Sequence, residues 1–190
     1  MARPLSEQKR EAILAAATEL VATQGVGAPT AKIAQSAGLA EGTLFKYFAT
    51  KDELLNQLYL AIKADLADAM LKAYPAEASV VERARHVWGC VIDWGAKYPL
   101  KRRAMRQLTV SDRVTAETRK IGAAAFHEVS AMLDQCASEG LVAIDAAGAF
   151  AGAIFDALAE TTLEFIAREP KKKEHYKSAG FKALWNGVAG

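Results

Sequence analysis

Apolar residues recur along this chain at the three- and four-residue spacing of a helix, and glycine, proline and capping residues separate the runs. At the start of the chain, we expect Ser6 to cap a helix that Gly25 and Gly27 end. Its apolar positions are Ala12, Ile13, Ala16, Ala17, Leu20 and Val21. No stretch alternates apolar and polar residues with the period of two that is typical of strands, so the pattern predicts an all-α fold.

The same spacing predicts the rest of the helices. Thr30 and Thr50 are the expected N-caps of the second and fourth, and Thr50-x-x-Glu53 is a capping box. After the first, helices are expected at about 30–37, 41–48, 51–73, 76–97, 99–108, 112–139, 145–168 and 171–188. The three helices at the start predict a small N-terminal domain, residues 1–50. The helix over 51–73 links it to a larger domain, residues 51–190.

The short helix in the sequence AGLAEGTLFKYF, residues 37–48, has two different sides. At 100° per residue one side is apolar, and we expect it to be buried: Leu44, Phe45 and Phe48. The other side is polar or open, and we expect it to face outward: Gly42, Thr43, Lys46 and Tyr47. With the short helix and tight AGLA turn before it, this pattern indicates a helix-turn-helix, whose second helix enters the major groove of DNA.

The side chains on the outward side suit contacts with nucleic acid. Gly42 allows a close backbone approach, Thr43 and Tyr47 can donate to phosphates or base edges, and Lys46 can reach a phosphate or a guanine. The flanking helices begin at Thr30 and Lys51. Helix N-termini carry free N–H groups and the positive end of the helix dipole, so both starts suit phosphate. The alternative is that Thr30 only caps its helix and that Lys51 is simply solvated.

The low net charge favours a specific DNA-binding protein over a general DNA coat. The whole chain carries a formal net charge of +2, and residues 1–60 carry six basic and six acidic side chains. A general DNA coat would be more basic, whereas a specific reader needs only a few well-placed charges. We expect Arg3, Lys9 and Arg10 to lie near the DNA backbone. Arg3 either reaches into a minor groove as an N-terminal arm or belongs to an unordered terminus.

Other classes of protein find little support. The two cysteines form neither a C-x-x-C motif nor a disulfide framework, and the first residues lack the apolar core of a signal peptide. The three histidines lack metal-ligand spacing, and no G-x-S-x-G or Walker motif is present. We therefore expect a cytoplasmic protein that is not an enzyme, with no cofactor, no metal and no membrane partner.

Residues 30–59, TAKIAQSAGLAEGTLFKYFATKDELLNQLY, resemble the helix-turn-helix of the tetracycline-repressor (TetR) family. The resemblance implies a homodimer that binds a palindromic operator on double-stranded DNA, usually as a repressor. It also implies release when a small-molecule effector enters the larger domain. The residues that carry it are Thr30, Ile33, Ala34, Ala37, Gly38, Gly42, Thr43, Leu44, Phe48, Lys51, Leu54 and Leu55.

Two positions depart from the pattern of that family. Phe45 stands where the family commonly has a tyrosine, so the hydroxyl that usually meets a phosphate is missing and Tyr47 is expected to replace it. Ala40 stands where serine or threonine often opens the reading helix, so that helix lacks a side-chain N-cap. This assignment predicts that Tyr47→Phe weakens operator binding, whereas Phe45→Tyr does not.

The larger domain offers candidate ligand contacts. Aromatic residues on and just after the helix over 76–97 can line an apolar cavity, with ordinary core packing as the alternative. Glu128 projects into the apolar side of the helix over 112–139, where it either pairs with Arg85 or faces a polar or cationic ligand. The expected ligand-contacting residues are Trp88, Ile92, Trp94, Tyr98, Phe126, Glu128 and Phe155.

Small residues are frequent in the last two helices, over 145–168 and 171–188, and they permit close helix packing. Two such helices from each of two chains would form a four-helix homodimer interface, with close packing inside one chain as the alternative. A ligand in the larger domain is expected to tilt the helix over 51–73 and change the spacing of the two reading helices. A dimeric regulator without a small-molecule ligand, or an activator, remains open as an alternative.

Overall fold

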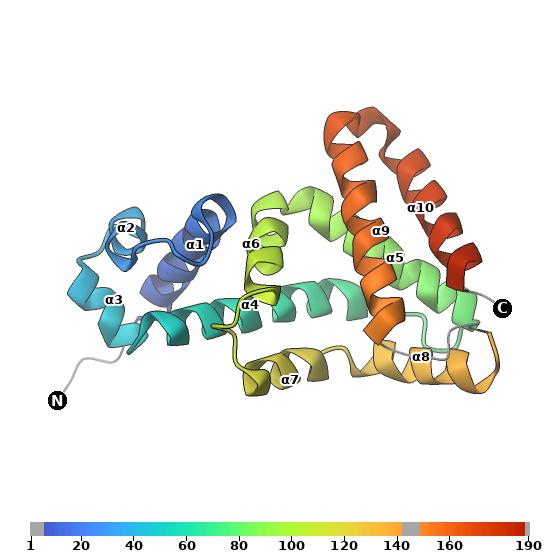
Figure 1. The fold of residues 1–190 in the computed structure, drawn as a ribbon, viewed down its shortest axis with the longest axis horizontal. Coiled ribbons are helices and arrows are strands. Elements are labelled where there is room, and N and C mark those ends of the chain that lie inside the picture. The colour runs from blue at the N-terminus through green and yellow to red at the C-terminus, as the bar shows by residue number, and fades with distance from the viewer. Residues whose placement is uncertain (1–5, 142–148, 189–190) are drawn as a thin grey trace. The chain divides into compact units, whose positions relative to one another are not determined.

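The computed structural model describes residues 6–141 and 149–188, and within these ranges every regular element is a helix (Figure 1). The all-α prediction is therefore confirmed. The helices are α1 (Glu7–Gln24), α2 (Thr30–Ser36), α3 (Glu41–Tyr47), α4 (Lys51–Leu71), α5 (Val80–Lys97), α6 (Pro99–Thr109), α7 (Ala116–Ala124), α8 (His127–Ser138), α9 (Ala149–Arg168), the short 3-10 helix η1 (Pro170–Lys172) and α10 (Lys173–Val188).

The chain forms two compact units that do not follow chain order. The first comprises Met1–Asp65 and Tyr98–Ala125, and the second comprises Leu66–Lys97 and Phe126–Gly190. Helices α6 and α7, from the middle of the sequence, thus belong with the N-terminal helices. These units are defined by packing, so the functional division at residue 50 stays a prediction.

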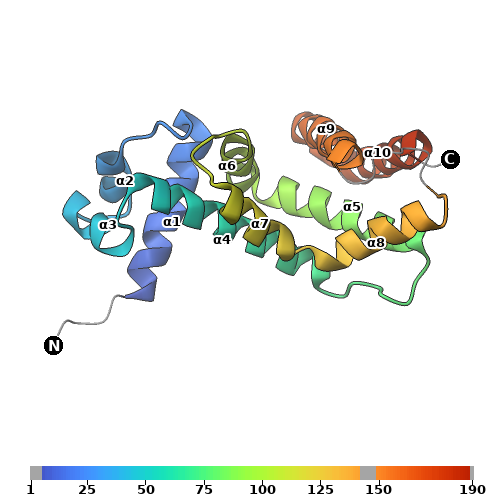
Figure 2. The ribbon, with the colours of Figure 1, turned by 60° about the horizontal axis from the view of Figure 1, so that its bottom comes forward.

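In the first unit, α1 packs against α2 and α6, and α2 packs against α3 (Figures 1 and 2). The side chains of Ala104 and Leu108 from α6 are fully buried, which shows how completely α6 joins this core. Burying a large aliphatic side chain contributes about 1.5–3 kcal/mol, so this core supplies much of the stability of the unit. Its most deeply buried members also include Ile13, Ala17, Val21, Ile33, Leu44, Phe48, Leu54, Leu55 and Leu58.

Glycines end the first helices as expected, but the predicted N-cap position of Thr30 is wrong, and Ser6 holds its predicted position without the expected side-chain bond. Gly25 and Gly38 have φ values of 77° and 69°, in the left-handed region that glycine adopts readily. Ser6 occupies the N-cap position of α1 without a side-chain capping bond. Thr30 is already the first residue of α2, because Pro29, with extended backbone, takes the N-cap position. Ala40 opens α3 without a side-chain cap, as the sequence predicts.

Thr50 and Glu53, the predicted capping pair, form hydrogen bonds at the start of α4. The Thr50 hydroxyl accepts a hydrogen bond from the Glu53 N–H at 3.0 Å. In return the Glu53 carboxylate accepts from the Ala49 N–H at 2.7 Å, one residue before the position that a capping box would use. The prediction is confirmed for the Thr50 bond, and together the two bonds define where α4 begins.

In the second unit, α5 packs against α8, α9 and α10, and α9 and α10 lie side by side, joined by η1 (Figure 1). The Trp88 indole N–H donates to the Lys177 carbonyl at 2.8 Å, which ties α5 to α10. A Cβ added at Gly180 would stand 2.5 Å from Thr162 Oγ1 and 2.6 Å from Trp88 Cζ2. This small residue therefore serves packing inside the chain. The buried cluster comprises Trp88, Ile92, Ala159, Leu163, Ile166, Phe181 and Leu184.

The single helix predicted over 112–139 is wrong. Thr115 caps α7 by accepting a hydrogen bond from the Thr118 N–H at 3.1 Å, and the helix stops at Ala124. A new helix, α8, starts after Phe126, whose backbone (φ −112°, ψ 28°) is not helical. The break shifts the angular phase of everything after it, so residues before and after it do not share one apolar face.

The start of the helix predicted over 145–168 lies outside the described residues, which resume at Ala149. Within the described ranges no helix is long and apolar enough to cross a membrane.

Candidate nucleic-acid interface

Helix α3 is held to the core by fewer residues than its periodicity predicts. Leu44 is fully buried and Phe48 is 1% exposed, but Phe45 is 40% exposed, so its place on the buried side is wrong. The helix has only seven residues, and Phe48 lies beyond its last turn in extended backbone (φ −138°, ψ 106°). Because Phe48 turns inward after the helix has ended, the 100° rule does not describe its direction.

The outer face of α3 is consequently Gly42, Phe45 and Lys46, all exposed, with Thr43 half-buried at its side. A Cβ added at Gly42 would meet nothing within 4 Å, so the space beside its backbone is open. The face combines an ammonium, an aromatic ring and bare backbone. These groups can meet phosphates, thymine methyls and the sugar–phosphate chain.

Tyr47 is half-buried rather than fully outward. The Ser6 N–H, at the start of α1, donates to its hydroxyl at 3.1 Å. The hydroxyl hydrogen can still be donated, because a phenol both accepts and donates. Tyr47→Phe would therefore remove the α1–α3 link as well as any phosphate contact, so that substitution alone does not report on DNA contact.

The Thr30 hydroxyl donates to the Glu41 carboxylate at 2.6 Å, so the starts of α2 and α3 are tied together. Near α1, the Arg10 guanidinium donates to Gln57 at 3.1 Å and lies 5.7 Å from the Phe48 ring centroid. Thr30 and Arg10, both predicted near DNA, therefore also make contacts within the first unit. Arg3, the expected minor-groove arm, lies outside the described residues.

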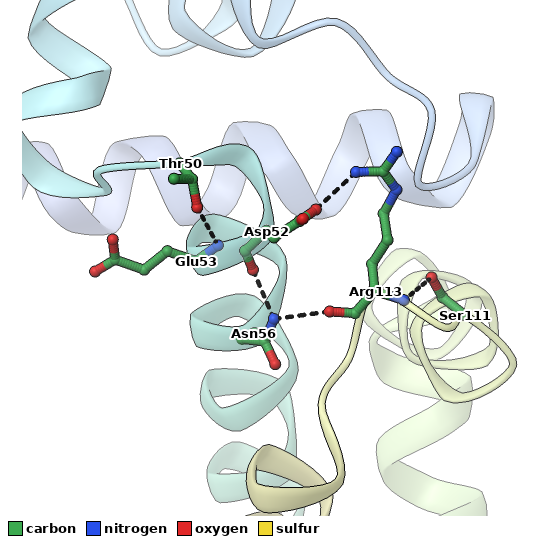
Figure 3. A network of polar contacts seen from close by, with 6 residues as sticks. All are labelled: Thr50, Asp52, Glu53, Asn56, Ser111 and Arg113. Atoms are coloured by element: carbon green, nitrogen blue, oxygen red, sulfur yellow. Dashed lines mark hydrogen bonds and ion pairs between the residues drawn. The ribbon is translucent and has the colours of Figure 1, made fainter.

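Lys51 is half-buried at the first position of α4. Burial, and then the positive charge of Arg113, lower the pKa of Lys51 below its ordinary value, while Asp52 acts in the opposite direction. Arg113 approaches from the segment between α6 and α7, where its guanidinium donates to the Asp52 carboxylate at 2.7 Å (Figure 3). Lys51 and the positive end of a helix dipole thus meet at this helix start, together with the Glu53 carboxylate and with Asp52, whose charge Arg113 balances.

The net charge of residues 1–60 does not represent the first unit, because residues 98–125 also belong to that unit. Residues 98–125 carry seven basic and two acidic side chains, a net charge of +5. Because the structure places them in the same unit as the helix-turn-helix, that unit is basic although residues 1–60 are neutral. A positive unit attracts the DNA backbone and speeds association. The basic residues are Lys101, Arg102, Arg103, Arg106, Arg113, Arg119 and Lys120.

Three of the predicted ligand-contacting residues come together in the second unit. Trp88 is 1% exposed and Ile92 fully buried, and the ring of Phe155 packs edge-on against Trp88 with centroids 5.4 Å apart. Trp94 is buried outside this cluster. Tyr98 belongs to the first unit, where Lys101 Nζ lies 4.6 Å from its ring centroid.

Glu128 does not enter an apolar face. It is exposed at the start of α8, with Oε1 3.4 Å from His127 Nε2, and Phe126 is the half-buried N-cap residue before it. The predicted partner Arg85 lies elsewhere, 4.3 Å from the Phe181 ring centroid. Glu128 shares a face of α8 with buried Met132, four residues later, but it lies in the first turn of the helix, where its side chain stays exposed. Among the described residues, no group of three or more His, Cys, Asp or Glu is placed to hold a metal ion.

A short helix that is anchored on one side and presents Gly42, Phe45 and Lys46 on the other, in a basic unit, defines the class of helix-turn-helix DNA-binding regulators. Residues 13–58 match the family model described as bacterial regulatory proteins, tetR family. The matched residues span α2, α3 and parts of α1 and α4, so this part of the chain carries the similarity to the TetR family.

Solved structures share the fold along nearly the whole chain. A TetR-family transcription regulator from Shewanella sp. PV-4 is 27% identical, with a TM-score of 0.82 over 96% of this chain and 98% of that one. Another from Marinobacter aquaeolei VT8 is 24% identical, with a TM-score of 0.82 over 96% of each chain. The regulator LfrR from Mycobacterium smegmatis, solved in complex with proflavine, is 20% identical, with a TM-score of 0.68 over 95% of this chain and 97% of that one.

Proposed function

We propose that this chain is a cytoplasmic transcriptional repressor that binds a palindromic operator as a homodimer and is released by a small, largely hydrophobic or aromatic ligand. The observation that carries the DNA-binding part is the outer face of α3, where Gly42, Phe45 and Lys46 are exposed beside half-buried Thr43. In a helix-turn-helix this is the face that enters the major groove.

Each proposed DNA contact has a separate chemical role. Lys46 reaches a phosphate or a guanine edge, and Gly42 lets the sugar–phosphate chain approach the backbone. Thr43 and Tyr47 donate their hydroxyl hydrogens to phosphates, and Lys51 meets a phosphate at the start of α4. Thr30 is a further phosphate contact, in competition with its bond to Glu41. Phe45, absent from the predicted contacts, adds an apolar contact to the methyl group of a thymine.

The homodimer would form through α9 and α10. Ala153, Ala157, Ala179 and Ala183 are exposed, and small exposed residues allow helices of a partner to approach closely. Phe150 on α9 is 55% exposed, and burial in an interface would remove its ring from water. Two-fold symmetry places two reading helices about 34–36 Å apart, one turn of DNA, and so matches a palindrome.

The ligand would enter the second unit beside Trp88, Ile92 and Phe155. Because Trp88 and Ile92 are almost fully buried, a ligand there has to displace packed side chains, and that movement would accompany release from DNA. A protein of this fold has been solved with proflavine, so proflavine is a reasonable first probe. The same dense packing favours the alternative, a regulator without a small-molecule ligand, and failure of a broad panel of aromatic compounds to release operator would support it.

Binding-site selection from random DNA with the purified protein tests the proposal. We expect recovery of a palindrome with half-sites one helical turn apart. Recovery of random sequences without enrichment would contradict specific operator binding. A non-palindromic single site would instead contradict the homodimer.

A further inference from the structure

The segment between α6 and α7 is fastened to the first two turns of α4, a sequence separation of almost 60 residues (Figure 3). The Asn56 side-chain amide donates to the Arg113 carbonyl at 2.9 Å and to the Asp52 carbonyl at 2.7 Å. Its oxygen accepts from the Thr115 N–H at 3.0 Å. One side chain on α4 therefore holds the backbone of the segment on both sides of Val114.

Arg113 adds a second fastening in the same place. Its guanidinium donates to the Asp52 carboxylate at 2.7 Å, and its own N–H donates to the Ser111 hydroxyl at 3.2 Å. The segment keeps its shape because the Arg119 guanidinium donates to the Thr109 and Ser111 carbonyls, both at 2.7 Å. The segment is thus a preformed surface for α4 rather than a loose connection.

Ordinary core packing does not require these polar bonds. Val114 is 3% exposed, so the segment also has a buried apolar contact that needs no polar bonds. The bonds instead converge on residues 52–56, immediately after Thr50 and Lys51. Arg113 also neutralises Asp52, a carboxylate that would otherwise repel a phosphate at Lys51. These bonds therefore indicate that the segment positions the start of α4.

We propose that Asn56 is a positioning residue for operator binding, which acts by fixing the start of α4 so that Lys51 meets a DNA phosphate. Residues 111–115 are then part of the DNA-binding apparatus although they lie outside the helix-turn-helix. The proposal rests on the phosphate contact of Lys51 given under the proposed function. Hydrogen bonds weaken steeply with distance and angle, so a small displacement of the helix start loses the contact.

A double-mutant cycle between Asn56→Ala and Lys51→Ala tests this, with operator affinity measured by fluorescence anisotropy over a range of salt concentrations. We expect Lys51→Ala to weaken binding and to lower the salt slope of the dimer by about two, one for each protomer. Asn56→Ala should weaken binding about fivefold per protomer and lower the same slope, because the net contribution of one hydrogen bond is about 1 kcal/mol. In the Lys51→Ala background Asn56→Ala should have no further effect. Val110→Ala, an 80% exposed side chain beside the segment, is the matched control and should bind like the parent.

The possible results separate two failures. If Lys51→Ala binds like the parent, the phosphate contact is absent, and the proposed contact and the positioning role both fall. If Lys51→Ala weakens binding but Asn56→Ala has no effect, only the positioning role is wrong. The same holds if Asn56→Ala weakens binding equally in the parent and in the Lys51→Ala background. Thermal unfolding of each variant checks the fold. Should Asn56→Ala not fold, Asn56→Leu replaces it in the cycle, because leucine keeps about the same side-chain volume and removes the bonds from Asn56 to the segment.

Discussion

Phe45 is a large apolar side chain left 40% exposed on the outer face of α3, beside Lys46 and Gly42. An exposed ring loses the favourable transfer from water that burial would give, so its position suits contact with an apolar group on a partner. The major groove offers one such group, the C5 methyl of thymine. Phe45 is thus expected to distinguish thymine from cytosine in each half-site.

Replacing single operator thymines by deoxyuridine tests this contact, since the change removes only the methyl group. We expect the parent protein to lose about fourfold in affinity at one position per half-site, the value of one buried methyl group. Phe45→Ala should bind the thymine and uracil operators equally, and Phe45→Tyr, which keeps the ring, should remain sensitive. A parent protein insensitive at every thymine, or a sensitive Phe45→Ala, would exclude the contact.

Among the elements, long helices were predictable and their ends and partners were less so. The apolar spacing of α1, α4 and α5 is repeated over several turns, so it survives local exceptions. The seven-residue α3 offers only two turns, and there the rule misplaced Phe45. The α7–α8 break was missed because no proline or glycine marks Ala125–Phe126. The bonds of Asn56 join distant segments, which periodicity along one chain cannot reveal.

Close packing of α10 against α9 and α5 depends on Gly180, and this can be measured. In Gly180→Ala the new methyl would clash with Thr162 Oγ1 at 2.5 Å and Trp88 Cζ2 at 2.6 Å. We expect urea denaturation to show a loss of about 1–3 kcal/mol in the free energy of unfolding. The matched control is Gly89→Ala on α5, where a Cβ meets nothing within 4 Å. It should gain about 0.5–1 kcal/mol from helix propensity. Equal stability of the two variants would contradict the packing described for Gly180.

For the whole molecule, operator affinity is expected to depend on pairing two chains as much as on any single DNA contact. One reading helix makes few contacts, and a second helix fixed at the right spacing makes its binding effectively intramolecular. The exposed alanines of α9 are the proposed site of that pairing. Substitutions there should therefore affect DNA binding although they lie in the second unit.

Ala157→Lys tests the pairing by bringing a charge into the proposed interface. Like charges facing each other across a two-fold axis cost several kcal/mol, so we expect mainly monomer by sedimentation equilibrium and an operator affinity at least roughly tenfold lower. Ala131→Lys, an exposed alanine on α8, is the control and should remain dimeric. If Ala157→Lys is a dimer with full affinity, the interface does not lie on this face of α9.

The first unit is built from two separate parts of the chain, so its core is completed only when the second part has been synthesised. Helices α1, α2 and α3 are synthesised before α6, and Ala104 and Leu108, which complete the core around α1, lie about 60 residues after the end of α3. At about 5–20 residues per second, roughly 3–12 s pass before α6 arrives. The helix proposed to read DNA is therefore synthesised before the residues of α6 that complete the core around α1.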